Sequence, residues 1–157
     1  MSKTTKATQF LEGAGVAFTL HTYTYDPEAP RVGLQAAEAL GEDPSRVLKS
    51  LMAEVDGKPV CAVIPSDQEV SMKKLAAAFG GKSANMMKVP DAERLTGYVV
   101  GGISPFGQKK TVPTAIEEMA LLEDRVYING GQRGLQVRLD PNEALAALGA
   151  KAADLIA

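Results

Sequence analysis

The segment 101–110, Gly-Gly-Ile-Ser-Pro-Phe-Gly-Gln-Lys-Lys, is the part of this sequence best suited to hold an anion. Its three glycines can adopt backbone angles that a side chain would forbid, and its proline stiffens the middle. Such a loop can direct several backbone N–H groups at one point, which is how proteins hold anions and developing oxyanions. The two closing lysines add positive charge. Taken alone, the segment is equally typical of a tight turn followed by solvated lysines.

Lys49 is the second candidate, because its strand would place it among aliphatic side chains. The segment 47–55 is typical of a strand, and a period of two puts Lys49 on the face of Val47 and Leu51. A buried ammonium without a partner is costly, so we expect it to face a cleft or to meet an acid or a phosphate. The alternative is a lysine that reaches water near a strand end. If both candidates serve one site, Lys49 and the 101–107 bend lie on the same side of the sheet.

Three further residues could contribute to a site. Arg133 lies between glycines in a second loop, 129–134, and an arginine can bind phosphate or carboxylate through two donors; a hairpin turn with a solvated arginine is the alternative. His21 is the only histidine, and a lone histidine is more often structural. Tyr23 could line a pocket or position a base by stacking, or be a half-buried sheet tyrosine.

A protein nucleophile with its base is not evident. Cys61 lies in an apolar run without a basic neighbour, which favours a small buried hydrophobe. Ser104 lacks the strand, elbow and helix of a hydrolase serine. One histidine and one cysteine cannot build a multi-ligand zinc site of these types, and no nucleotide-binding fingerprint occurs, so we expect no metal and no cofactor. The pattern indicates a binding site, or a reaction in which the substrate supplies its own nucleophile.

Helices and strands alternate along the chain. Asp56-Gly57 between two apolar runs predicts a hairpin, which excludes a purely parallel sheet. We expect one α/β (α+β) domain over 1–157, with a mixed sheet curled toward a barrel and helices around it. Helices are predicted from Thr4 or Thr5 to 13 and at 33–40, 71–79, 90–95 and 140–148, and the expected caps are Thr4 or Thr5, Ser71 and Asp140. Strands are predicted at 18–23, 47–55, 59–64, 83–87, 111–116, 125–128 and 135–139. The segment 117–122 is either a helix or a turn.

Composition sets broad limits on the class of protein. The 157 residues are 45% hydrophobic and 23% charged, which fits a globular protein. The net charge of −2 means that nucleic-acid binding would need a local basic patch. A single cysteine precludes an internal disulfide and suits a reducing cytoplasm, and neither a signal peptide nor a membrane-spanning run is predicted.

Together these segments resemble the YbaK/EbsC family of free-standing aminoacyl-tRNA deacylases and the editing domain inserted in bacterial-type prolyl-tRNA synthetases. The resemblance extends in order over nearly the whole chain. It rests on His21-Thr22-Tyr23, Arg46-Val47-Leu48-Lys49-Ser50-Leu51, the whole of 101–110, and Gly130-Gly131-Gln132-Arg133-Gly134-Leu135. The region around Glu143 matches less distinctly.

The resemblance implies a cytoplasmic enzyme that deacylates Cys-tRNA(Pro) at the tRNA acceptor end, in transient contact with prolyl-tRNA synthetase. The substrate thiol would attack its own ester carbonyl, while the protein orients the ester and stabilises the oxyanion. The expected site has catalytic Lys49, Gly101 and Gly102, substrate-binding Tyr23, Ser104, Pro105, Phe106, Gly107 and Arg133, and tRNA-contacting Lys109 and Lys110. The alternatives are a deacylase for another misacylated tRNA, such as Ala-tRNA(Pro), and a non-catalytic module that binds an aminoacyl-tRNA end or a nucleotide.

Overall fold

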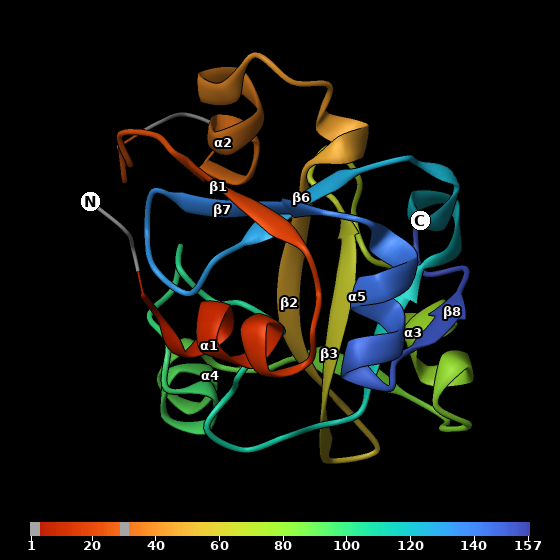
Figure 1. The fold of residues 1–157 in the computed structure, drawn as a ribbon. Coiled ribbons are helices and arrows are strands. Elements are labelled where there is room, and N and C mark those ends of the chain that lie inside the picture. Colours follow the sequence, from red (N-terminus) through yellow and green to blue (C-terminus); the bar gives the residue numbers. More distant parts are fainter. Residues whose placement is uncertain (1–3, 29–31) are drawn as a thin grey trace.

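A five-stranded sheet forms the centre of the computed structural model, which describes residues 4–28 and 32–157 (Figure 1). Its order is β4-β2-β3-β5-β8, with antiparallel pairs around β2 and parallel pairs on both sides of β5. The strands are β2 (Leu48–Val55), β3 (Lys58–Pro65), β4 (Ala84–Met86), β5 (Thr114–Glu117) and β8 (Lys151–Ala153). The predicted hairpin joins β2 to β3, and Asp56 and Gly57 both have positive φ, as a two-residue turn of this kind requires.

A second, antiparallel sheet of three strands has the order β1-β7-β6. Its strands are β1 (Phe18–Thr22), β6 (Val126–Asn129) and β7 (Leu135–Leu139). A single parallel bridge, Val47 to Tyr127, links it to the start of β2. The mixed α+β architecture is as predicted, but the curl toward a barrel is not confirmed, because this one bridge does not close the two sheets into a barrel.

Helices cover both sheets, and most begin at the predicted capping residues. Thr5, Ser71 and Asp140 each accept a hydrogen bond from a backbone N–H of the helix that follows. The helices are α1 (Lys6–Gly13), α2 (Val32–Leu40), α3 (Met72–Ala78), α4 (Val89–Thr96) and α5 (Pro141–Leu148), with 3₁₀ turns η1 (Pro44–Arg46) and η2 (Glu118–Leu122). Within 4–28 and 32–157, none of the helices has the length and apolar composition that crossing a membrane requires.

The two faces of β2 contribute to different parts of the core. Leu48 and Met52 pack with Phe106 and with residues of α1 and α5. Ala53 and Val55 pack on the other face, with residues of α3. This alternation decides on which side of the sheet each candidate side chain of β2 lies.

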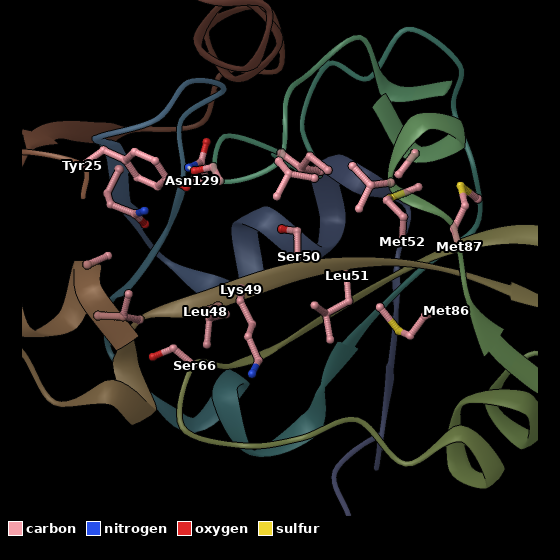
Figure 2. Close-up of a pocket in the computed structure, with 18 of the residues that line it drawn as sticks. Tyr25, Leu48, Lys49, Ser50, Leu51, Met52, Ser66, Met86, Met87 and Asn129 are labelled. Carbon is pink, nitrogen blue, oxygen red and sulfur yellow. Dashed lines mark hydrogen bonds between the residues drawn. The ribbon is translucent and has the colours of Figure 1, made fainter. Parts of the chain in front are cut away.

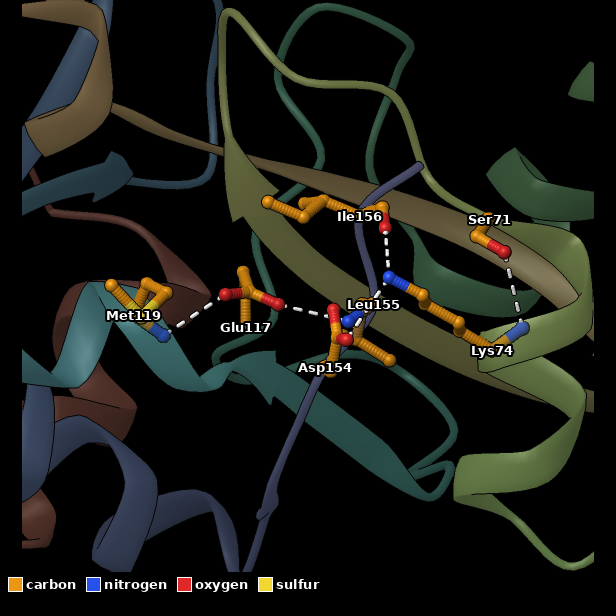
Figure 3. A network of polar contacts seen from close by, with 7 residues as sticks. All are labelled: Ser71, Lys74, Glu117, Met119, Asp154, Leu155 and Ile156. Carbon is orange, nitrogen blue, oxygen red and sulfur yellow. Dashed lines mark hydrogen bonds and ion pairs between the residues drawn. The ribbon is translucent and has the colours of Figure 1, made fainter.

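The C-terminal segment is attached through a buried acid (Figure 3). Glu117 is 1% exposed, and its two carboxylate oxygens accept the backbone N–H groups of Leu155 at 2.8 Å and Met119 at 2.9 Å. Lys74 Nζ donates to the carbonyl of Ile156 at 2.8 Å. These bonds keep the end of the chain beside β5 and α3. The strand β8 was not predicted, since Lys-Ala-Ala has little intrinsic preference for a strand and depends on its pairing with β5.

Candidate functional site

A pocket of about 350 Å³ lies along the outer edge of β2 (Figure 2). Residues 47–52 form one wall. The other wall consists of Asn129 and Gln136, which belong to the smaller sheet, and Tyr23, which directly follows β1. Val100, Gly101 and Ile103 and the segment from β4 to α4 line much of the remainder, and Tyr25, Ala36 and Ser66 complete the lining. The volume is at the small end for ligand pockets, and the lining is largely apolar with a few polar groups, as ligand sites commonly are.

The pocket exists because β2 is longer than its outer neighbour. β4 pairs only with residues 53–55, and beyond it one further bond, from Met87 N to Met52 O at 3.1 Å, continues the contact. In an antiparallel strand the N–H and C=O of alternate residues point to the same side. Since Met52 directs its carbonyl outward, Ser50 directs its own backbone groups to the same open edge.

Gly101 forms the part of the wall that can stabilise negative charge. Its φ of +90° is one that glycine adopts readily. Asn129 Nδ2 donates to the Gly101 carbonyl at 3.1 Å, and Arg133 Nε donates to the Val100 carbonyl at 2.8 Å. The peptide is therefore held from both sides. Within the described residues the N–H of Gly101 donates to no acceptor, and Gly101 lines the pocket.

Arg133 and Tyr25 hold this loop together. The Arg133 guanidinium carbon lies 5.1 Å from the centre of the Tyr25 ring, a cation–π distance. A Cβ on Gly101 would lie 2.7 Å from Tyr25 Oη, so the tyrosine packs directly against the glycine. We expected Arg133 to bind substrate, but its Nε is occupied by the Val100 carbonyl. Tyr25 was missed, although it follows Tyr23 at the spacing of a strand face.

Lys49 lies on the other side of the strand from the glycine loop, contrary to our expectation. In Figure 2 its ammonium points away from Ser50, on the side of the strand where Ser66 lies. The loop packs on the Ser50 face: Gln108 Nε2 lies 3.6 Å from Met52 Sδ and donates to the Ser104 carbonyl at 3.0 Å. The reason is strand alternation, because the apolar face that carries Lys49 is the one covered by α3.

Lys49 nevertheless borders the same pocket, since the open edge of β2 gives access to both of its faces. Partial burial lowers the pKa of the Lys49 ammonium, and the nearby carboxylates of Glu69 and Asp67 act in the opposite direction. It is thus a cation that has lost part of its hydration at the rim of a cavity, where it would gain from meeting an anionic ligand.

The remainder of the glycine loop serves packing. Gly102 donates its N–H to the Val99 carbonyl at 2.8 Å, so this amide, which we expected to be catalytic, is already used. Its close approach to the backbone of Arg133 leaves no room for a Cβ. Gly107 has a φ of +66°, and a Cβ there would collide with the Lys6 carbonyl at the start of α1. Neither glycine lines the pocket.

Ser104, Pro105 and Phe106, which we expected to bind substrate, are buried and do not line the pocket. Ser104 Oγ accepts the N–H of Phe106 at 3.1 Å, a local turn contact. The Phe106 ring stacks on Phe10 with centroids 6.0 Å apart. These residues shape the loop from inside, and only Gly101 and Ile103 of the segment 101–110 reach the cavity.

Lys109 and Lys110 line a second cavity of about 460 Å³ together with Arg94. Their backbone N–H groups donate to the carbonyls of Thr96 at 2.8 Å and Leu95 at 3.2 Å, which attaches the end of the loop to α4. Glu54 and Asp91 lie in the same cavity, and Asp91 pairs with Arg94. Met87 lines both cavities, so the two adjoin.

Three other candidates lie outside the pocket. The ring of His21 contacts Thr19 Oγ1 at 2.8 Å and the edge of Tyr127. Cys61 is fully buried, and burial raises the pKa of its thiol to about 12, which makes it unreactive. Glu143 is exposed in the first turn of α5. Tyr23 does line the pocket, and burial raises the pKa of its phenol.

Comparison with known proteins agrees with this architecture. Residues 26–147 match the aminoacyl-tRNA editing domain family. A protein of Enterococcus faecalis named "Putative Cys-tRNA(Pro)/Cys-tRNA(Cys) deacylase EbsC" is 43% identical over 111 residues, which cover 69% of this chain and 67% of that protein. The proline–tRNA ligase of Maridesulfovibrio salexigens is 30% identical over 100 residues, 64% of this chain but only 17% of the ligase.

Solved structures share the whole fold. A crystal structure described as a "putative trans-editing enzyme for prolyl tRNA synthetase" superposes with a TM-score of 0.82 at 25% identity, covering 99% of both chains. The hypothetical protein APE2540 superposes with a TM-score of 0.85 over 98% of this chain and all of that one; at 23% identity this similarity concerns the fold alone. The family match covers most of the sequence, and the chain belongs to the aminoacyl-tRNA editing domain family.

Proposed function

We propose that this protein is a free-standing editing enzyme that removes cysteine from mischarged Cys-tRNA(Pro). The observation that carries the proposal is the Gly101 peptide, whose N–H is free and whose position is set by Asn129 and Arg133. A preorganised backbone donor beside a small cavity suits the oxyanion of an acyl-transfer reaction. The EbsC relative, named for deacylation of Cys-tRNA(Pro) and Cys-tRNA(Cys), supports this substrate class.

The proposed reaction uses the nucleophile of the substrate. The cysteine sulfur attacks the ester carbonyl, the carbonyl oxygen becomes the oxyanion, and the bond to the ribose oxygen then breaks. The ribose oxygen takes up a proton as the thiol proton is lost to solvent, and the cysteine leaves as a thiolactone that water opens. Holding a thiol and a carbonyl of one molecule in contact can remove several kcal/mol from the barrier. A substrate that supplies its own nucleophile needs neither a cysteine nor a histidine from the protein, which is consistent with a pocket that neither Cys61 nor His21 lines.

We place the two ends of the substrate on opposite sides of the β2 edge. The ester carbonyl meets the Gly101 N–H on the Ser50 face, and Lys49 meets the terminal adenosine or its phosphate on the other. Met86, Val89 and Val100 are apolar residues of the pocket wall that are 45%, 52% and 39% exposed. They offer a surface on which a nucleobase can pack.

The adjoining basic cavity extends this path along the tRNA. Lys109 and Lys110 are exposed, and with Arg94 they would meet backbone phosphates of the acceptor end. Three cations against two carboxylates give weak, salt-sensitive attraction. Selectivity for one tRNA then has to come from elsewhere, and a transient complex with prolyl-tRNA synthetase would supply it.

A panel of charged tRNAs tests the proposal. Purified protein is incubated with tRNA(Pro) carrying cysteine, serine, alanine or proline and with Cys-tRNA(Cys), and ester loss is followed. Rapid loss of cysteine and slow loss of serine are expected, because a hydroxyl is a weaker nucleophile than a thiol. Equal loss of cysteine, serine and alanine contradicts attack by the substrate thiol. Saturable binding without product would instead indicate a non-catalytic module.

A further inference from the structure

Two oxygen atoms in the wall of the pocket are buried and have no hydrogen-bond partner among residues 4–28 and 32–157. They are Ser50 Oγ, on β2, and Oε1 of Gln136, on β7, a residue whose side-chain amide also faces the phenol of Tyr23. Both residues line the 350 Å³ pocket, and Gln136 is only 4% exposed. Figure 2 shows Ser50 directed into the cavity. A buried polar atom without a partner is costly, so two on one cavity wall indicate that a ligand completes them.

The chemistry of these atoms restricts what the ligand presents. A glutamine oxygen only accepts hydrogen bonds, and a serine hydroxyl can accept while its own proton turns elsewhere. They come from two different sheets, so one ligand group serving both must carry more than one N–H or O–H. A thiol or a hydroxyl has one such proton. On the amino-acid part of an aminoacyl ester, the α-amino group has two or three.

We propose that Ser50 Oγ and Gln136 Oε1 accept hydrogen bonds from the α-amino group of the bound aminoacyl ester. This inference rests on the proposed function and assigns the amino-acid end of its site. With the carbonyl at the Gly101 N–H and the amino group at these two oxygens, two of the groups bonded to the α-carbon are held in place. The side chain is then directed to one region of the cavity, which brings the thiol to its own carbonyl.

A neighbouring serine provides a matched control. Ser66 lines the same pocket, but its Oγ donates to the Pro44 carbonyl at 3.1 Å and so has a partner within the protein. Ser50→Ala removes an atom that has no partner in the part of the chain that the structure describes, and it should leave the melting temperature unchanged or raise it. Ser66→Ala removes a satisfied hydroxyl from the same cavity and should lower the melting temperature.

The test compares two esters that differ only in the amino group, Cys-tRNA(Pro) and 3-mercaptopropionyl-tRNA(Pro). Each enzymatic rate is divided by the uncatalysed hydrolysis rate of that ester. For the wild-type protein we expect kcat/KM to be roughly 10- to 100-fold lower without the amino group, the value of one or two hydrogen bonds. Ser50→Ala and Gln136→Met should each lower kcat/KM for the cysteinyl ester by about 10-fold. Neither should affect the ester without the amino group.

The outcomes separate this inference from the proposed function. Equal wild-type rates on the two esters overturn the amino-group assignment while leaving the deacylase intact. So does a Ser50→Ala variant that slows both esters by the same factor, or a Ser66→Ala variant that changes their ratio as Ser50→Ala does. If the wild-type protein cleaves neither ester, the proposed function fails, and the assignment fails with it.

Discussion

Replacing Gly101 by alanine should lower the rate of editing by about 10²–10³-fold at a modest cost in stability. The φ of +90° costs an alanine about 1–2 kcal/mol. The new Cβ would lie 2.7 Å from Tyr25 Oη and 2.9 Å from its ring. The tyrosine therefore has to move by about 0.8 Å to reach an ordinary contact distance. The total is about 2–3 kcal/mol of unfolding free energy, or a fall in melting temperature of roughly 4–12 °C.

The loss of activity should far exceed what this destabilisation explains. Relieving the strain rotates the peptide that precedes Gly101 and redirects its N–H. Loss of one oxyanion donor commonly lowers kcat by about 10²–10³-fold. The assay is single-turnover deacylation of Cys-tRNA(Pro) at a temperature where both proteins are fully folded by circular dichroism.

Gly149 provides the control for backbone strain. Its φ is +60°, and a Cβ there meets nothing within 4 Å. Gly149→Ala should cost about 1–2 kcal/mol of stability and leave deacylation unchanged. If Gly101→Ala is no less active than Gly149→Ala, the Gly101 peptide plays no part in the reaction, and the proposed oxyanion site is wrong.

Three further predictions concern the lysines and the buried acid. Because burial lowers the pKa of the Lys49 ammonium, this lysine loses its charge at a lower pH than a free lysine, whose pKa is near 10.5. The background-corrected kcat/KM should therefore fall as pH rises through this range, and Lys49→Arg should move the fall to higher pH. An unchanged rate in Lys49→Ala would remove this residue from the mechanism. Lys109→Ala and Lys110→Ala should each lower kcat/KM and flatten its dependence on log salt concentration, whereas Lys73→Ala on α3 should do neither. Glu117→Ala removes the acceptor of the buried Leu155 N–H and of the partly buried Met119 N–H, and it should cost about 2–5 kcal/mol in urea unfolding with no direct effect on a folded active site.

Local signals predicted the fold well where they act over a few residues. The Asp56-Gly57 hairpin and the caps at Thr5, Ser71 and Asp140 all occur as predicted. The place where the pocket opens along β2 was not predictable in this way. It depends on how far β4 extends along β2, and the three residues of β4 carry no signal of that length.

The site was only partly predictable for the same reason. A glycine-rich sequence predicts a loop with unusual backbone angles, but it does not predict which of its N–H groups lacks an acceptor. That depends on Asn129 and Arg133, which belong to another segment. Ser50 and Gln136 gave no signal as residue types. Their importance comes from being buried without partners, which only the packed structure reveals.

The position of Lys49 is the correction with the largest consequence. Strand periodicity correctly grouped it with Leu51, and the error was to assume that the glycine loop packs on that face. An ammonium on the far side of a fully paired sheet could not act on the same ligand. Here residues 48–51 have an open edge, and in the proposed complex an extended acceptor end crosses it with its ester on one side and a phosphate on the other. In the proposed complex, Lys49 would therefore anchor the nucleotide instead of contacting the carbonyl. It follows that Lys49→Ala should raise KM for charged tRNA more than it lowers kcat, and that Gly101→Ala should do the reverse.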